Sequence, residues 1–350
     1  MNIELSIATV FALVACGAGA MLALVLLGAR KHRTIWLAAF VGTFSFSLLT
    51  GFLGALSVST AWAWFASQLL VLNFLAMPFL YFYAADAVGK PAANKLFHCL
   101  PAAIAAIAIA VHPDLNRTHL YWVLVLQSVL YLAYVLYLIS KYRLQVREQY
   151  SSLSQIDLMW LQTMVVALLL LGIFDIIVFP LARQFWITPA AAQSAFNFLG
   201  TLYLFWMARG AISQEFVNLD QKIGVTSPSY EKSGLDSDSA NALAGEIQKT
   251  MNGQQLHLQP ELSLSSLAEA VGITPHITSE VLNKTIGQSF YDFVNQRRIS
   301  TAKSLLAETE QSILDIAFMS GFNNKVSFNK AFRRFEAITP SEYRRLNRPS

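Results

Sequence analysis

The chain has 350 residues, of which 55% are hydrophobic and 13% are charged, with a formal net charge of +4 and a mean hydropathy of +0.46. Soluble domains carry roughly 25% charged residues, so this composition leaves too few polar groups to cover a protein surface in water. It excludes an ordinary soluble globular protein and predicts that most of the chain lies in lipid.

Apolar runs of about 20 residues are long enough to cross the hydrocarbon core of a bilayer. Residues 1–211 contain seven such runs, of which the fourth is the shortest, and they predict a seven-transmembrane helix bundle. The start of the chain lacks the basic region of a signal peptide, so we expect the first run to be an uncleaved membrane helix. The runs are Ile3–Leu27, Ile35–Leu56, Trp62–Tyr83, Leu96–Val111, Leu120–Ile139, Leu158–Phe179 and Ala190–Met207.

Charges between the runs predict how the bundle is oriented. The loops after the first, third and fifth runs are basic, whereas the alternate loops offer only Arg117 and Arg183. Positive residues accumulate on the cytoplasmic side of a membrane. We therefore expect a multi-pass protein of the bacterial inner membrane, with its N-terminus outside and its C-terminal domain in the cytoplasm. The basic loop residues are Arg30, Lys31, Arg33, Lys90, Lys95, Lys141, Arg143 and Arg147.

Residues 212–239 are rich in glycine, serine, proline and aspartate, which predicts a flexible linker. After the linker, Leu243, Ile247 and Met251 follow the i, i+4, i+8 spacing of an amphipathic helix. This helix either packs on its own domain or forms a dimer contact.

Two helix-turn-helix patterns lie within residues 240–350, at about 262–284 and 313–335. In the first, Gly272 marks the turn, and Thr274 and Pro275 suit the cap and first position of the second helix. In the second, Gly321 marks the turn, and apolar residues at helical spacing form one face. The apolar residues are Ile313, Ile316, Ala317, Phe322, Phe328, Phe332 and Phe335.

The second pattern closely resembles the second helix-turn-helix motif of AraC/XylS-type transcription regulators. The shared residues are Ile316, Ala317, Gly321, Phe322, Ser327, Phe328, Phe332, Arg333, Thr339, Pro340, Tyr343 and Arg344. The first pattern and the connecting helix from Phe290 to Leu306 resemble the corresponding parts of the family, so the likeness covers Leu256–Leu346. It implies an all-α domain that binds double-stranded promoter DNA.

The resemblance also implies which side chains meet DNA. In the second motif, Lys325, Val326, Asn329 and Lys330 occupy the positions that family members use to reach the major groove, where Asn can bond adenine and Lys can reach guanine. Arginine suits phosphates, which position a protein without specifying sequence. The alternative is a merely solvated basic face. The candidate phosphate contacts are Arg333, Arg334, Arg344 and Arg345.

The first motif departs from the family pattern. Its matching outward positions hold His276, Ser279, Glu280 and Asn283, and many family members have arginine where this chain has Glu280. A carboxylate near phosphates weakens binding, so we expect this motif to bind DNA more weakly. Two further departures are Thr278, where the family has an apolar residue, and Ala337, where it usually has glycine. A positive φ at Ala337 would cost on the order of 1 kcal/mol.

Polar residues inside the apolar runs are the candidates for sensing, because burying them in lipid is expensive. Asp175, Asn73, Gln127 and Asn197 are candidate ligand contacts. The alternative is that they form hydrogen bonds between helices.

The sequence shows no catalytic constellation, no phosphate-binding glycine loop and no metal-ligand spacing at Cys16 or Cys99, so we expect neither an enzyme nor a cofactor or metal. We predict a one-component transcription regulator with promoter DNA, membrane lipid and an unknown small-molecule or membrane signal as partners, and a possible homodimer. The alternative is a membrane transporter or enzyme with a C-terminal interaction module.

Overall fold

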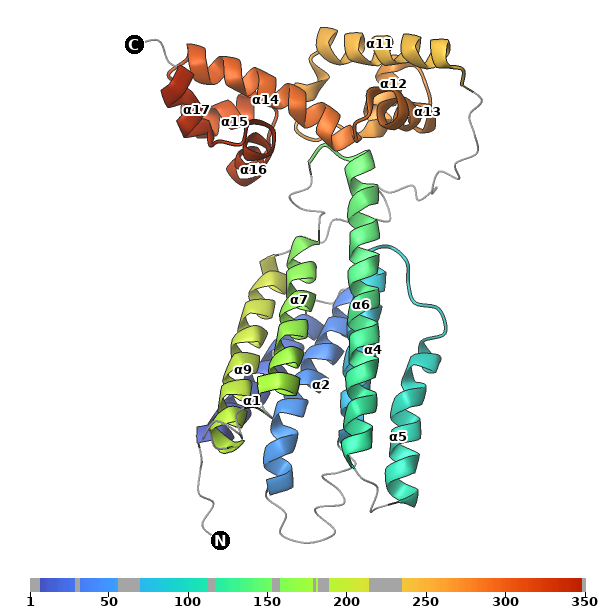
Figure 1. Ribbon diagram of the computed structural model, residues 1–350, viewed down its shortest axis with the longest axis vertical. Helices are drawn as coiled ribbons and strands as arrows, with labels where there is room; N and C mark the ends of the chain where they lie inside the picture. Colours follow the sequence, from blue (N-terminus) through green and yellow to red (C-terminus); the bar gives the residue numbers. More distant parts are fainter. Residues whose placement is uncertain are drawn as a thin grey trace. The chain divides into compact units, whose positions relative to one another are not determined.

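The computed structural model describes residues 7–28, 32–55, 70–112, 117–152, 158–178, 181, 189–213 and 235–347. Within these ranges the regular secondary structure is helical and there is no strand (Figure 1). One isolated bridge joins Tyr150 to Ser263. The chain forms two compact units. The N-terminal unit comprises Met1–Ser140 and Leu158–Glu215, and the C-terminal unit comprises Lys141–Asp157 and Phe216–Ser350.

The helices of the N-terminal unit fall on the seven predicted apolar runs. The fifth, α6, continues beyond the predicted end at Ile139 and passes into the C-terminal unit. A short helix precedes α4 and another precedes α5, and a π-helix follows α7. The elements are α1 (Ile7–Gly28), α2 (His32–Ala55), η1 (Leu70–Leu72), α4 (Asn73–Ala87), η2 (Lys95–Cys99), α5 (Leu100–Val111), α6 (Arg117–Gln149), α7 (Met159–Ile173), η3 (Phe174–Val178) and α9 (Pro189–Ser213).

Two described helices are long and apolar enough to cross a membrane, His119–Gln149 and Met159–Ile177. Four other apolar helices are shorter, so the predicted seven-span bundle is not confirmed within the described residues. Several parts of that prediction lie outside the described residues, namely the third run before Leu70, the loop with Arg183, and most of the linker 212–239. The shorter helices are Leu13–Gly28, Thr34–Ser47, Lys95–Val111 and Ala195–Met207.

The N-terminal unit buries one set of apolar side chains and exposes another. Helix α1 packs against α2 and α9, and α2 packs against α4. The outward faces carry large apolar side chains such as Leu24, Ile104 and Leu130, which are more than half exposed. These three side chains lie on α1, α5 and α6. The buried set includes Leu37, Phe40, Leu80, Leu161 and Met164.

Proline 78 lies inside α4 and removes the backbone donor that would bond to the Phe74 carbonyl one turn earlier. The side chain of Gln127, from α6, donates to that carbonyl through Nε2 at 2.9 Å. A buried carbonyl without a partner is costly. Gln127 therefore restores the hydrogen bond that the proline removes, and it ties α6 to α4.

The C-terminal unit holds two small helical cores that share one long helix, α14. Phe290, Phe293 and Val294 of α14 belong to the first core, whereas Ile299, Ala302 and Leu306 belong to the second. The helices are α11 (Ser237–Gly253), η4 (Leu256–Leu258), α12 (Leu264–Val271), α13 (Pro275–Glu280), η5 (Val281–Ile286), α14 (Phe290–Glu308), α15 (Ile313–Met319), α16 (Lys325–Glu336) and α17 (Pro340–Asn347).

Side-chain caps set where these helices begin. The side chain of the residue just before each helix accepts a hydrogen bond from a backbone N–H in the first turn. That N–H has no acceptor within the helix itself. The capping residues are Asp236 for α11, Ser263 for α12, Thr274 for α13, Ser289 for α14, Ser312 for α15 and Asn324 for α16. Helix α11 packs on its own domain, because Ile247 and Met251 are fully buried in the first core.

Candidate nucleic-acid interface

The second helix-turn-helix motif consists of α15, a turn at Gly321 and α16. Gly321 has φ +85°, and a Cβ atom there would lie 2.5 Å from the carbonyl oxygen of His257. Only glycine fits this turn, because the backbone of η4 packs directly against it. Phe328 and Phe332 of α16 are fully buried and stack edge to face at 5.7 Å, so the opposite face of the helix must point outward.

The outward face of α16 presents three cations. Lys325, Lys330 and Arg333 are exposed, and none of them forms an ion pair with another described residue. Val326 beside them is 78% exposed, and Asn329 is half-buried. The predicted set thus shares one face of one helix. That face offers cations for phosphates, an amide for a base edge and an apolar contact for a thymine methyl group.

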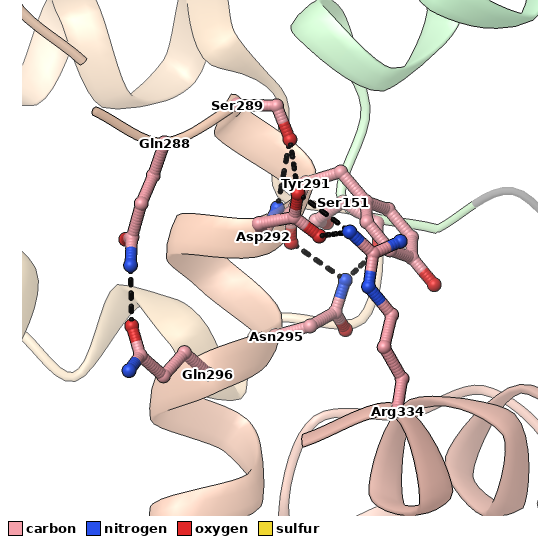
Figure 2. A network of polar contacts seen from close by, with 8 residues as sticks. All are labelled: Ser151, Gln288, Ser289, Tyr291, Asp292, Asn295, Gln296 and Arg334. Atoms are coloured by element: carbon pink, nitrogen blue, oxygen red, sulfur yellow. Dashed lines mark hydrogen bonds and ion pairs between the residues drawn. The ribbon is translucent and has the colours of Figure 1, made fainter. Parts of the chain in front are cut away.

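Two predicted phosphate contacts have partners inside the protein. Arg334 points from α16 towards Asp292 of α14, with Nη2 at 2.9 Å from the carboxylate (Figure 2). Arg344 donates from Nη2 to the carbonyl oxygen of Gln311 at 2.6 Å. These arginines connect elements of the domain, so binding a phosphate would compete with the contacts that they already make.

The first motif consists of α12, a turn at Gly272, and α13, which continues into the π-helix η5. The second helix begins at Pro275 as predicted, but its α-helical part ends at Glu280 rather than near Lys284. The hydroxyl of Thr278, a position that is apolar in the family, is fully buried and donates to the Thr274 carbonyl at 3.0 Å. The polar group is therefore satisfied, and the core tolerates it.

The outward positions of the first motif are more enclosed than those of α16. His276, Ser279 and Asn283 are half-buried, and Asn283 donates to the Ser279 hydroxyl at 3.2 Å. The side chain of Glu280 is only 14% exposed and accepts from Lys284 Nζ at 2.7 Å. The predicted repulsion between Glu280 and phosphates is therefore reduced by a lysine one turn away. This pairing was not predicted from the sequence, although the i, i+4 spacing indicates it.

The candidate sensing residues lie in different settings. Asp175 accepts from the Tyr121 hydroxyl at 2.8 Å, and Gln127 is engaged by the Phe74 carbonyl. The side-chain oxygen of Asn73 is buried, and Asn197 is 2% exposed. Three or more metal-ligating side chains do not gather anywhere in the part of the chain that the structure describes.

The geometry of both motifs defines a class of protein, a helix-turn-helix domain, and comparison with known proteins agrees. Residues 267–346 match a family model described as a helix-turn-helix domain. An uncharacterized HTH-type transcriptional regulator of Staphylococcus aureus (strain COL) is 36% identical over 110 residues, which cover 31% of this chain and 14% of that protein. The uncharacterized HTH-type transcriptional regulator YtdP of Bacillus subtilis (strain 168) is 33% identical over 116 residues, which cover 32% and 15%.

Among solved structures, the C-terminal domain of AraT, a response regulator from Geobacillus stearothermophilus, is 29% identical and covers 32% of this chain and 87% of that one, with a TM-score of 0.28. The C-terminal part of the chain is an AraC-type helix-turn-helix domain, and its homologues are named HTH-type transcriptional regulators. The chain spans about 14% of the length of the first of these relatives.

Proposed function

We propose that the protein is a membrane-embedded one-component regulator, which binds promoter DNA through its C-terminal domain in response to a signal received by the N-terminal unit. One observation carries the proposal. A single chain joins a helix-turn-helix domain with an exposed cationic helix, α16, to a helical unit whose outward faces carry large apolar side chains.

The DNA-binding half of the proposal rests on α16. Lys325, Lys330 and Arg333 lie on one face of it, opposite the buried Phe328 and Phe332. The cations would grip phosphates, while Asn329 and Val326 would reach base edges. Each phosphate that a cation neutralises releases counterions, so the affinity should fall steeply as salt rises.

The membrane half rests on composition and exposure. The apolar helices, the basic loops that follow the first, third and fifth runs, and the exposed leucines and isoleucines support insertion in the bacterial inner membrane with the C-terminal domain in the cytoplasm. The proposed signal is a small molecule or a property of the membrane. Asp175, bonded to Tyr121, is the charged group that a ligand would meet.

The first experiment maps genome-wide the DNA bound by the full chain in its native membrane, then measures the affinity of the detergent-purified chain for an enriched fragment and for a scrambled fragment of equal length. We expect a preference for the enriched fragment that persists at moderate salt. Equal affinity for both fragments at every salt concentration would rule out a sequence-specific regulator.

A second experiment tests the membrane topology. Spheroplasts that carry a C-terminal epitope tag are treated with protease before and after lysis. We expect the tag to be protected until lysis, and to remain with the membrane fraction after a wash with alkaline carbonate. A tag that is digested in intact spheroplasts would place the C-terminal domain outside and contradict the proposal.

A further inference from the structure

Three consecutive residues that follow α6, and that belong to the C-terminal unit, pack against its helix-turn-helix part. Tyr150 forms an antiparallel bridge with Ser263, Ser151 is buried, and the hydroxyl of Ser152 donates to Asn323 Oδ1 at 3.0 Å. One turn earlier on α6, the guanidinium of Arg147 lies 5.5 Å from the centre of the Tyr291 ring, within the range of a cation–π contact. We call Tyr150–Ser152 the docked segment.

Every polar atom of Ser151 is engaged. Its N–H donates to the Leu262 carbonyl at 3.3 Å, and its hydroxyl donates to the same carbonyl at 2.7 Å. Its own carbonyl accepts from Asn295 Nδ2 at 3.1 Å, a bond that crosses from α14 in Figure 2. Ser151 is 1% exposed, so these bonds are shielded from water. Buried backbone groups need partners within the protein, and those of Ser151 find them in Leu262 and Asn295.

Arg298 forms the floor of the docking site. Its guanidinium donates to the carbonyl oxygens of His257 and Gln259, each at 2.7 Å, and to the Ser151 hydroxyl at 3.1 Å. The side chain is 1% exposed and forms no ion pair with any described residue. Burial lowers the pKa of Arg298 to about 10, which leaves it charged at neutral pH. A buried charge is stable only when hydrogen bonds satisfy it. Removing the docked segment would take the Ser151 hydroxyl away from the Arg298 guanidinium, and water would have to replace that hydrogen bond.

The docked segment contacts residues 235–347 of its own unit at three places. Its partners Leu262 and Ser263 immediately precede α12, the first helix of the first motif. Its partners Asn295 and Arg298 lie on α14, which joins the two cores. Asn323 immediately precedes the cap of α16. The three residues therefore contact the first motif, the connecting helix α14 and the turn before α16. We call the second helix of each motif, α13 with η5 in the first and α16 in the second, its recognition helix.

We propose that the docked segment transmits the signal, by holding the two helix-turn-helix motifs in one relative orientation until a change in the N-terminal unit withdraws it. This rests on the proposed function. Helix α6 begins in the N-terminal unit and runs without a break over 33 residues, which is about 50 Å at roughly 1.5 Å per residue. A shift of α6 therefore reaches the docked segment through one continuous helix. The signal acts as a population shift between docked and undocked states.

Docking is tested by cross-linking in the full chain. Ser152→Cys and Asn323→Cys are introduced after Cys16→Ala and Cys99→Ala remove the native thiols, and a short thiol-to-thiol reagent is applied in membranes. We expect rapid cross-linking of this pair and slow cross-linking of a control pair, Ser152→Cys with Lys249→Cys on the exposed face of α11. Equal rates for the two pairs would overturn docking.

A second measurement tests whether docking is coupled to DNA binding. If docking changes the affinity for DNA, then bound DNA must change docking by the same factor. A contact that only stabilises the fold would not respond to bound DNA. The enriched fragment should change the cross-linking rate of the 152–323 pair by about fivefold or more, whereas the scrambled fragment should not. Binding of the enriched fragment with no change in rate would overturn the transmission role. Docking without any selective DNA binding would instead remove the proposed function, and the transmission role with it.

A matched pair of substitutions completes the test. Ser151→Ala removes the hydroxyl that bonds Leu262 and Arg298, and Ser300→Ala makes the same chemical change at an exposed position of α14. Ser151→Ala should slow cross-linking of the 152–323 pair and weaken its response to the enriched fragment. Ser300→Ala should leave both unchanged. A Ser151→Ala chain that behaves like Ser300→Ala would show that the hydroxyl does not hold the segment.

Discussion

The two helix-turn-helix motifs have the same order of helix, turn and helix. They differ in how closely the turn packs against the rest of the domain and in whether the outward charged side chains form ion pairs. The turn glycine of the second motif, Gly321, is pressed against the backbone of η4, whereas a Cβ atom at Gly272 would meet nothing within 4 Å. The outward cations of α16 lack ion pairs among the described residues, whereas Glu280 in the first motif is paired with Lys284. The second motif therefore combines a closely packed turn with outward cations that lack ion pairs among the described residues. This difference predicts that the second motif contributes more to DNA binding than the first.

The largest expected effect is on stability. Gly321→Ala adds a Cβ atom 2.5 Å from the His257 carbonyl at a φ of +85°, so both overlap and backbone strain oppose it. We expect a loss of about 3 kcal/mol in the local unfolding free energy of α15 and α16. Gly272→Ala has the strain without the overlap, and should cost about 1–2 kcal/mol. Hydrogen exchange of the α15–α16 and α12–α13 amides, read by mass spectrometry on the full chain, measures both.

Equal losses of local unfolding free energy for Gly321→Ala and Gly272→Ala would contradict the difference in packing at the two turns. A third variant, Gly253→Ala, supplies the baseline, because this glycine lies at the end of α11 and nothing lies within 4 Å of its added Cβ atom.

The next effect is on DNA affinity. Lys330→Ala and Arg333→Ala each remove an exposed cation from α16, and each should lower affinity for the enriched fragment by about 1–3 kcal/mol, or roughly five- to 150-fold. A substitution of a phosphate contact should also reduce the salt dependence by about one counterion. His276→Ala and Asn283→Ala, in the more enclosed first motif, should have smaller effects. Titration of labelled DNA at several salt concentrations measures all four.

The control is Lys249→Ala, which removes a cation from the exposed face of α11, outside both motifs. Losses at His276 or Asn283 that equal those at Lys330 and Arg333 would show that both motifs carry the binding energy. Loss at Lys249 would indicate a general effect of net charge.

A smaller effect distinguishes the ends of the two recognition helices. The first ends at Gly287 with φ +74°, and the second ends at Ala337 with φ +60°. Alanine is strained in this left-handed region, so Ala337→Gly should stabilise α16 by up to about 1 kcal/mol, while Gly287→Ala should destabilise η5 by a similar amount. Hydrogen exchange of the flanking amides gives the sign. A destabilised Ala337→Gly chain would mean that the flexibility gained when unfolded outweighs the strain relieved.

Local patterns predicted the C-terminal domain well, because each signal there acts within a few residues. Gly272 and Gly321 marked turns and Thr274 marked a cap. Ala337, where the family usually has glycine, has a positive φ in the structure. The apolar spacing of α16 likewise defined which face would carry Lys330 and Arg333. The AraC-type domain was thereby predicted from sequence, although its DNA contacts stay a prediction.

Contacts between distant residues were beyond prediction. Nothing in the sequence near Ser151 indicates that its partners are Leu262, Asn295 and Arg298, which lie more than a hundred residues away. The contacts of Arg334 with Asp292 and of Arg344 with Gln311 also join residues that are distant in sequence, so the sequence did not indicate them. The seven apolar runs predicted helices, but residue spacing alone does not establish that each crosses a membrane.

The smallest effect concerns the acidic residue that sets the first motif apart. Glu280 is mostly covered and accepts from Lys284 at 2.7 Å, so each charge screens the other. Glu280→Gln removes the i, i+4 ion pair, which should destabilise the helix by about 0.3–0.5 kcal/mol. The same change frees Lys284 to approach phosphates, and should raise DNA affinity a few-fold with a steeper salt dependence.

Glu280→Gln together with Lys284→Ala distinguishes the two consequences. If the freed lysine causes the gain, the double variant loses it and regains the original salt dependence. If the gain persists, the carboxylate itself repelled the DNA despite its partner. In either case the first motif lies close enough to phosphates to respond to its own charge. An affinity that is unchanged in both variants would place the first motif away from the DNA and leave α16 as the only contact of the two recognition helices.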